Sequence, residues 1–306
     1  MSVLSSLTLI RFRGQVTNEA SYQWAQSMVP EYLLRDFILL CYTSLGSGDS
    51  ARRMGLLMTA FRHLVLAILF SVTLNTGAAE NVSDPAQVER DQILSLTALA
   101  VVYKDWQQFP GGRGHNIGSI LADKHSVPVF WARNTVNMSG DASQHGEVRL
   151  IQGFLNCPVI GKYADGFTVY TTLEPCAMCT GMMSLTRVSR VVYVQADPEY
   201  GSARDALVKI GYPQMFEQYS PPEMSQKKSL DEGYKNFKTR NPGVTIIDYL
   251  LSPEAKRIFA SAEVELKGYK PRFEENVRVV ESALAFLNKV PEKGGDDRLA
   301  EFCPSN

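Results

Sequence analysis

The sequence predicts an α/β protein, in which helices and strands form a sandwich behind a mostly helical N-terminal region. Residues 84–197 alternate in the order α-β-β-α-β-α-β, which is the pattern of helices layered on a sheet. The preceding residues carry apolar side chains at helical spacing, which is typical of amphipathic helices. At 306 residues, with 45% apolar and 21% charged side chains, the chain is long enough to bury a full hydrophobic core.

The N-terminal region, residues 1–84, is predicted to contain helices. One is expected over residues 30–45 and a second over 51–74, after the break "GSGDS". Asp49 or Ser50 can cap the second helix, because both side chains accept hydrogen bonds from a helix N-terminus. The apolar stretch "LVLAILFSVTL" within it is too short to span a bilayer and indicates a buried core helix.

The central segment is predicted to supply the sheet and the helices that cover it. A helix is expected over 84–106, with Asp84 as N-cap and Pro85 at its first position. The strand-like runs "IGSILAD" and "VPVFWARN", separated by "KHS", predict a hairpin. The remaining elements follow in turn: a helix over 144–155, a strand over 166–174, a helix over 175–188 and a strand over 190–197.

The C-terminal part is predicted to be less regular. Residues 212–243 are rich in Pro, Lys, Glu and Ser and are expected to form a long loop or insertion. A last strand is expected from "TIIDYLL", followed by helices over 252–268 and 271–290 and by a tail of about a dozen residues. We therefore expect three parts: an N-terminal helical extension over 1–84, a main domain over 85–268, and a C-terminal helix and tail over 269–306.

Charge and cysteine content predict the environment of the protein. Lys and Arg number 31 against 32 Asp and Glu, so bulk charge favours neither a nucleic acid nor an acidic partner. The N-terminus does not resemble a signal peptide, because Arg11 and Arg13 follow its apolar run. The five cysteines are scattered except for one pair, unlike a secreted disulfide framework. We therefore expect a cytoplasmic location in a reducing environment, with no membrane association.

The one close pair of cysteines is Cys176 and Cys179, in "TTLEPCAMCTGMM". Such a pair can form a disulfide, a redox couple, or half of a structural or catalytic zinc site. It lies where a strand is expected to pass into a helix, and a helix N-terminus lowers thiol pKa and favours the thiolate that binds metal. A catalytic zinc has three protein ligands and one open position, so a third ligand is required.

The segment "DASQHGEVRL" supplies the missing groups, His145 and Glu147. In the first turn of a helix both side chains can face one crevice, so that His145 can bind zinc while Glu147 reaches a water in the open position. Zinc lowers the pKa of such a water toward ~7, and a nearby carboxylate can move its proton to a leaving amine. Cys157 is the nearest candidate for a fourth ligand, and it lies ten residues beyond Glu147.

H-x-E followed by P-C-x-x-C is the signature of zinc-dependent nucleobase deaminases. The stretch "TLEPCAMCTGMMSLTRVSRVVY" resembles bacterial tRNA-specific adenosine deaminases, of the cytidine and deoxycytidylate deaminase-like superfamily, almost residue for residue. The resemblance covers residues 85–265. It implies a three-layer α/β/α cytidine-deaminase-like fold and a Zn2+ cofactor held by His145, Cys176 and Cys179. It also implies hydrolytic deamination with Glu147 as the catalytic residue.

The resemblance also points to a substrate site. The candidate substrate-binding residues are Asn134, Asp141, Glu174, Pro175 and Asp197. Asn134 lies eleven residues before His145 and matches the position that contacts the nucleoside in these enzymes. Structural alternatives remain, because Asn134 can end a strand in a turn, Asp141 can lead into the helix, and Glu174 can shape the loop before the cysteines. Gly146 stands where the family usually has alanine, and adds backbone freedom at the helix start.

We predict deamination of a nucleobase, with adenosine in an RNA such as tRNA as the leading substrate. The alternatives are a free base or nucleoside (guanine, adenine or cytosine), and a non-catalytic RNA-binding partner subunit, which typically lacks the glutamate found here. Residues 226–240 carry five basic side chains with interleaved aromatics, which suits either solvated surface or contact with unpaired nucleic acid. Arg113 and His115 either belong to a flexible loop or contact a phosphate. A homodimer is expected by analogy with the family.

Overall fold

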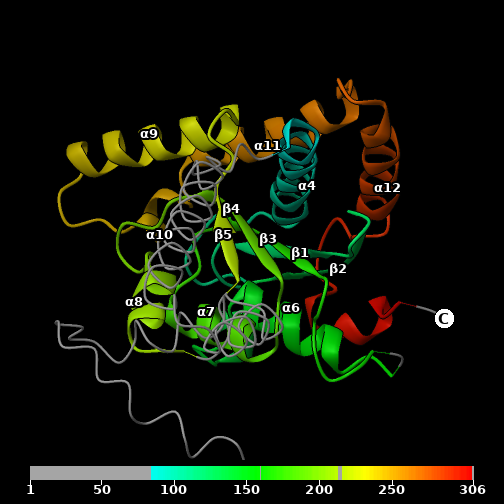
Figure 1. The fold of residues 1–306 in the computed structure, drawn as a ribbon. Helices are drawn as coiled ribbons and strands as arrows, with labels where there is room; N and C mark the ends of the chain where they lie inside the picture. Colours follow the sequence, from blue (N-terminus) through cyan, green and yellow to red (C-terminus); the bar gives the residue numbers. More distant parts are fainter. Residues whose placement is uncertain (1–83, 159, 213–215, 305–306) are drawn as a thin grey trace, which may run out of the picture. The chain divides into compact units, whose positions relative to one another are not determined.

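The computed structural model describes residues 84–158, 160–212 and 216–304. The helices that the sequence predicts over 30–45 and 51–74 lie outside this part of the chain. From residue 84 onward the described elements belong to one compact unit. The unit consists of a five-stranded sheet between two layers of helices (Figure 1), which confirms the predicted α/β/α arrangement.

The sheet has the strand order β2-β1-β3-β4-β5. Strand β1 pairs antiparallel with β2 and β3, whereas β3, β4 and β5 run parallel to one another. The strands are β1 (Gly118–Ala122), β2 (Pro128–Arg133), β3 (Thr168–Leu173), β4 (Arg190–Gln195) and β5 (Glu217–Tyr219). The four longer strands are almost entirely buried, as expected for a sheet that helices cover on both faces.

Helix α4 (Pro85–Lys104) covers one face of the sheet and packs against β1 and β3. Its start is as predicted: Pro85 is the first helical residue, and the Asp84 side chain accepts a hydrogen bond from the backbone N–H of Ala86 at 3.1 Å. Helices α11 (Pro253–Gly268) and α12 (Val277–Leu287) pack against α4, and α9 (Ser225–Arg240) packs against α11. No helix in the described part of the chain is long and apolar enough to cross a bilayer.

The opposite face is covered by helices that follow the central strands. Helix α6 (Gly146–Leu155) packs against β1 and β2, and α7 (Ala177–Leu185) packs beside α6. Both helices start at one edge of the sheet (Figure 1). The shorter elements are α5 (Val136–Ser139), α8 (Ala203–Lys209), α10 (Ile246–Tyr249) and the 3-10 helices η3 (Glu274–Asn276) and η4 (Asp296–Phe302).

A buried ion pair fastens α4 to the sheet. Asp91 is fully buried on α4 and accepts hydrogen bonds from both terminal nitrogens of Arg190, at the start of β4. The Tyr170 hydroxyl on β3 donates to the same carboxylate at 3.0 Å. These partners offset the cost of removing the carboxylate from water, so the pair also specifies how α4 sits on the sheet.

Two predictions for residues 212–251 are wrong. Most of the expected loop over 212–243 is structured: β5 extends the sheet, and α9 buries Leu230 and Tyr234. The segment "TIIDYLL" forms helix α10 instead of a strand. Thr245 and Asp248 form a capping box there, in which each side chain accepts a hydrogen bond from the other residue's backbone. A short apolar run is compatible with either a strand or a helix. In this segment the tertiary packing and the capping box favour the helix.

The C-terminal segment also differs from the expected tail. It forms η4, in which Asp296 and Leu299 are buried, and η4 packs against β2 and α6. A disulfide joins Cys303, just after η4, to Cys157, just after α6. The sequence offers no signal for this pair, because 146 residues separate the two cysteines. Disulfides persist mainly in oxidising compartments, so the cytoplasmic location stays a prediction.

Replacing Cys303 with serine should lower the free energy of unfolding by about 2–5 kcal/mol, because the disulfide closes a long loop and restricts the unfolded chain. Chemical denaturation of the oxidised wild type and of Cys303→Ser measures the difference. Cys157→Ser should give the same loss, and reduction of the wild type should reproduce it. Equal denaturation midpoints for oxidised wild type and variant would contradict the structural role of the bond.

Candidate metal centre and substrate pocket

The N-terminus of α6 presents His145 and Glu147. His145 is the N-cap residue, with extended backbone angles, and Glu147 lies in the first helical turn. Gly146 lets this end of α6 approach β1 closely, since a Cβ there would lie 2.9 Å from the Cα of Gly118. The absence of a side chain at Gly146 therefore serves packing, in addition to the backbone freedom that the sequence suggests.

The N-terminus of α7 presents the two cysteines to the same point. Cys176 is the N-cap residue of α7, and Cys179 follows within its first turn. The sulfur atoms lie 3.6 Å apart, and the His145 Nδ1 atom lies 3.7 Å from Cys176 Sγ and 3.5 Å from Cys179 Sγ. The three ligand atoms thus form a compact triangle between two helix N-termini.

The triangle fits a zinc ion. Zn–S bonds of about 2.3 Å and Zn–N bonds of about 2.0–2.1 Å at tetrahedral angles place ligand atoms roughly 3.4–3.8 Å apart, which matches the three separations. Of the described residues, only His145, Cys176 and Cys179 form a cluster that could hold a metal ion. Three protein ligands are also the usual number in a catalytic zinc site.

The electrostatics of the cluster favour a bound cation. The hydrogen bond shared with Cys179 lowers the pKa of Cys176 to about 4, and His145 acts in the same direction. The same bond, together with burial, raises the pKa of Cys179. The hydrogen bond to Cys176 raises the pKa of His145. One thiolate therefore already exists near neutral pH, and a metal can replace the proton that the other sulfur retains.

Glu147 is buried beside this cluster. Its Oε1 atom accepts a hydrogen bond from the Thr171 hydroxyl at 2.9 Å, and its Oε2 atom lies 3.6 Å from Cys179 Sγ. Burial raises the pKa of the Glu147 carboxyl, while the positive charge of His145 and the Thr171 hydroxyl act against this shift. A carboxyl with a raised pKa is suited to accept and return a proton near neutral pH.

A pocket of about 430 Å³ opens over the cluster. Its wall includes His145, Glu147 and Cys176, so the potential metal position and the carboxylate face the same space. The apolar lining residues are Ile117, Leu173, Met178, Ile246 and Ile247, and the other polar ones are His115, Asn134, Glu174, Asp197 and Tyr200. Apolar walls with a few convergent polar groups are typical of small-molecule sites.

The structure brings three of the five predicted substrate-binding residues to the pocket wall: Asn134, Glu174 and Asp197. Glu174 accepts hydrogen bonds from the backbone N–H groups of Asp197 (3.2 Å) and Ser202 (2.8 Å), so it organises the loop after β4. Asp197 accepts from the N–H groups of Glu199 and Tyr200 through Oδ1.

The other two lie outside the pocket lining. Asp141 is exposed and accepts hydrogen bonds from the Ser143 N–H and the Gln144 amide, which lowers the pKa of Asp141. Pro175 is buried, and its carbonyl accepts a hydrogen bond from Thr180. These contacts build the turns that lead into His145 and Cys176, and a substrate role for either residue stays a prediction.

Sequence reasoning missed the contribution of α10 to the site. Ile246 and Ile247 line the pocket, although the segment was expected to form a strand. The pattern Thr245-x-x-Asp248 before an apolar run is a helix-start signal that could have identified this helix. Its position over the pocket, however, depends on contacts between α9 and α10 that no sequence pattern predicts.

Comparison with known proteins agrees with this geometry. Residues 91–195 match the cytidine and deoxycytidylate deaminase zinc-binding region. The matched segment includes His145, Glu147 and both cysteines of the cluster.

The curated relatives carry different activities in their names. A tRNA-specific adenosine deaminase of Bacillus subtilis is 36% identical over 86 residues, covering 28% of this chain and 52% of the relative. A probable cytosine deaminase of Schizosaccharomyces pombe is 29% identical over 115 residues, covering 38% of this chain and 64% of the relative. This chain thus spans less than two thirds of either relative.

A solved structure from a study of A-to-I editing by tRNA:A34 deaminases is also similar to this chain. Its sequence is 26% identical, and the match covers 37% of this chain and 83% of that one, with a TM-score of 0.32.

We predict that the purified protein binds one zinc ion, and that alanine at His145, Cys176 or Cys179 abolishes this binding. Each substitution removes one of three ligands, and two ligands do not form a stable site. Metal content by mass spectrometry after dialysis measures the effect. Cys157→Ser is the matched control, because Cys157 lies in the disulfide and should keep full occupancy. Equal zinc content in the ligand variants and the control would exclude this centre.

Proposed function

We propose that this protein is a zinc-dependent hydrolytic deaminase of a nucleobase. The observation that carries the proposal is the buried Glu147 carboxyl beside three converging metal ligands at the base of a pocket. Such a carboxyl has a direct use in hydrolysis of an amidine, where a proton must leave the nucleophile and reach the departing amine. The family match of residues 91–195 supports this assignment.

His145, Cys176 and Cys179 would hold the zinc ion. When bound there, zinc would supply an acidified water as the nucleophile near neutral pH. Glu147 lines the pocket next to this position, so its carboxylate can accept the proton of the nucleophile. The same group can donate that proton to a ring nitrogen of the base, then take the second proton from the oxygen that has added to the ring carbon and pass it to the amino group. The C–N bond breaks, ammonia leaves, and the oxygen remains as a carbonyl. Thr171 holds Glu147 in place through Oε1, and Oε2 lies on the side of the proposed metal ligands, 3.6 Å from Cys179 Sγ, where it can exchange the proton.

The rest of the pocket would bind the base. Ile117, Leu173 and Ile246 offer apolar contacts to a planar ring. Asn134 is 1% exposed, and its Nδ2 atom has no hydrogen-bond partner within the described residues. A buried amide without a partner costs free energy, so a substrate acceptor such as a hydroxyl or carbonyl oxygen would be favoured there. Asp197 would accept from an N–H group at the same wall.

Two substrate classes are compatible with this pocket. Adenosine in RNA is supported by the names of relatives such as the tRNA-specific adenosine deaminase of Bacillus subtilis. The exposed Lys228 and Lys235 on α9 offer a small amount of positive charge for RNA. A free base or nucleoside is favoured by a different observation: α10 adds two isoleucines to the wall of a pocket of about 430 Å³, which suits a small substrate. The presence of Glu147 argues against a non-catalytic partner subunit.

Glu147→Gln should retain zinc and lower kcat at least about 100-fold, because the amide cannot carry the proton between nucleophile and leaving group. Release of ammonia and mass spectrometry of products measure the rate. Glu281→Gln, at an exposed position of α12, is the matched control and should retain full activity. Comparable rates for Glu147→Gln and wild type would exclude this mechanism.

The substrate can be identified by offering total tRNA in one assay and free bases and nucleosides in another. We expect inosine to appear in tRNA, at a rate that falls as salt rises, because binding to phosphates releases counterions. A neutral nucleoside would show almost no such salt dependence. Product from the nucleoside pool alone would exclude RNA as the substrate and leave a small-molecule deaminase. No product from either pool, with zinc bound, would exclude the proposed reaction for these substrates.

A further inference from the structure

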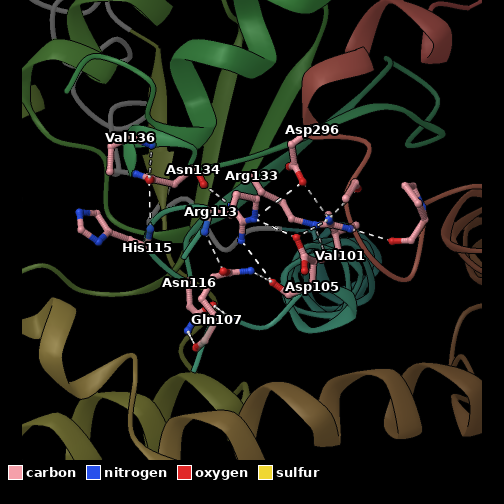
Figure 2. A network of polar contacts seen from close by, with 12 residues as sticks. Val101, Asp105, Gln107, Arg113, His115, Asn116, Arg133, Asn134, Val136 and Asp296 are labelled. Atoms are coloured by element: carbon pink, nitrogen blue, oxygen red, sulfur yellow. Dashed lines mark hydrogen bonds and ion pairs between the residues drawn. The ribbon is translucent and has the colours of Figure 1, made fainter. Parts of the chain in front are cut away.

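A largely buried cluster of charges lies next to Asn134, which lines the substrate pocket. It contains three guanidinium groups and two carboxylates, from Arg113, Arg133, Arg149, Asp105 and Asp296. Figure 2 shows four of these residues next to Asn134. Asp296 belongs to η4, about a hundred residues beyond the end of the family match at residue 195. Nothing in the proposed chemistry uses this cluster directly.

The carboxamide of Asn134 has a defined orientation. Its Oδ1 atom accepts hydrogen bonds from the backbone N–H groups of His115 at 3.1 Å and Val136 at 3.2 Å. Because both bonds hold Oδ1, they also fix the position of the amide nitrogen Nδ2. This nitrogen has no hydrogen-bond partner in the described part of the chain. Gly114 packs so closely that a Cβ there would lie 2.4 Å from Oδ1. The orientation of this amide therefore depends on how the loop around Gly114 is held.

Arg113 holds that loop. Its Nη1 atom donates a hydrogen bond to the backbone carbonyl of Asn134, so the side chain ties the loop to the end of β2 (Figure 2). Its Nε atom lies 3.2 Å from a carboxylate oxygen of Asp105 and 3.7 Å from one of Asp296. Arg113 is itself buried, so it needs these anions to offset the loss of its hydration.

Asp296 is placed to hold the arginines. Its side chain is 1% exposed, and its Oδ2 atom lies 3.2 Å from Arg133 Nη1 as well as near Arg113. Burial raises the pKa of Asp296, and the charges of Arg133 and Arg113 oppose this shift. Without the Asp296 charge, the guanidinium groups of Arg113 and Arg133 would share the single carboxylate of Asp105. Arg113 would then lose one of its two anionic partners.

We propose that Asp296 is a positioning residue of the active site, which acts through Arg113 to fix the carboxamide of Asn134 toward the substrate. The C-terminal segment is then part of the substrate site, although no atom of Asp296 lines the pocket. The inference rests on the proposed function only where it assumes that Asn134 contacts substrate. The hydrogen-bond geometry around Asn134 is independent of that assumption.

The test compares Asp296→Asn with Asp297→Asn. The first substitution keeps the shape of the buried side chain and removes its charge, whereas Asp297 is exposed and its only ion pair among the described residues is with Arg298. The Arg149 contact uses the backbone carbonyl of Asp296, so neither substitution removes it. Steady-state kinetics with total tRNA, or with the nucleoside that the wild type converts, gives KM and kcat. Hydrogen–deuterium exchange at the His115 and Val136 amides reports whether these N–H groups stay bonded to the Asn134 carboxamide, and this measurement needs no substrate.

We expect Asp296→Asn to raise KM by roughly 2- to 30-fold with little change in kcat, and to speed exchange at both amides. Asp297→Asn should change neither KM nor the exchange rate at these amides. In an Asn134→Ala background the effect of Asp296→Asn on KM should largely disappear, because the group through which it acts is absent. Zinc content should stay at the wild-type level throughout.

Three results would overturn the proposal. One is an Asp296→Asn variant with the KM and exchange rates of Asp297→Asn. Another is a parallel loss of kcat, zinc and exchange protection across the whole protein, which would show a purely structural role. The third is an unchanged KM effect in the Asn134→Ala background.

If Asp296→Asn does not fold, Arg113→Lys decides with the same readouts, because lysine keeps the charge but lacks the planar guanidinium that reaches the Asn134 carbonyl. If the wild type converts none of the substrates, the proposed function fails for them. Amide exchange at His115 and Val136 is then the measurement that tests whether Asp296 positions Asn134.

Discussion

The site depends on the meeting of two helix N-termini at one edge of the sheet. His145 and Cys176 are both N-cap residues, of α6 and α7, and each helix follows a strand or loop that ends at this edge. Helix N-termini carry partial positive charge and unpaired N–H groups, which stabilise thiolate and carboxylate side chains placed there. The same arrangement places Glu147 in the first turn of α6, where it is buried against the sheet and accepts a hydrogen bond from Thr171. The proposed metal ligands and the proposed proton carrier are therefore both positioned by these two helix N-termini.

Buried charges hold the elements that carry this arrangement. Asp91 and Arg190 fix α4 on one face of the sheet, and Asp296 with its arginines fixes the C-terminal segment near β2 and α6. Breaking a buried ion pair by removing one partner typically costs about 3–5 kcal/mol. Such pairs are weak contributors to net stability but strong determinants of geometry, since alternative packings would leave a charge without a partner. The disulfide between Cys157 and Cys303 adds a covalent restraint to the same segment.

The pocket combines segments from inside and outside the family match. Asn134, His145, Glu147 and Cys176 lie within residues 91–195. Asp197, Tyr200 and the isoleucines of α10 lie beyond it. The residues of the proposed chemistry therefore lie within the family match, whereas the wall that would bind the base is built from residues inside and outside it. The reaction class is therefore easier to infer than the substrate, whose proposed contacts lie only partly within the family match.

The sequence by itself determined the alternation of helices and strands from Asp84 to Asp197, and it identified the candidate metal-binding and acid–base residues. These are local properties: Pro85 after Asp84 starts a helix, the β-branched and aromatic residues of "VPVFWARN" favour a strand, and H-x-E with P-C-x-x-C indicates the chemistry. Only the tertiary structure decided that α10 (Ile246–Tyr249) lines the pocket, that Asp296 is buried among arginines, and that Cys157 meets Cys303. These contacts join residues far apart in the chain. Their free energy comes from burial and from pairing of charges that meet only after folding, so no local pattern in the sequence can report them.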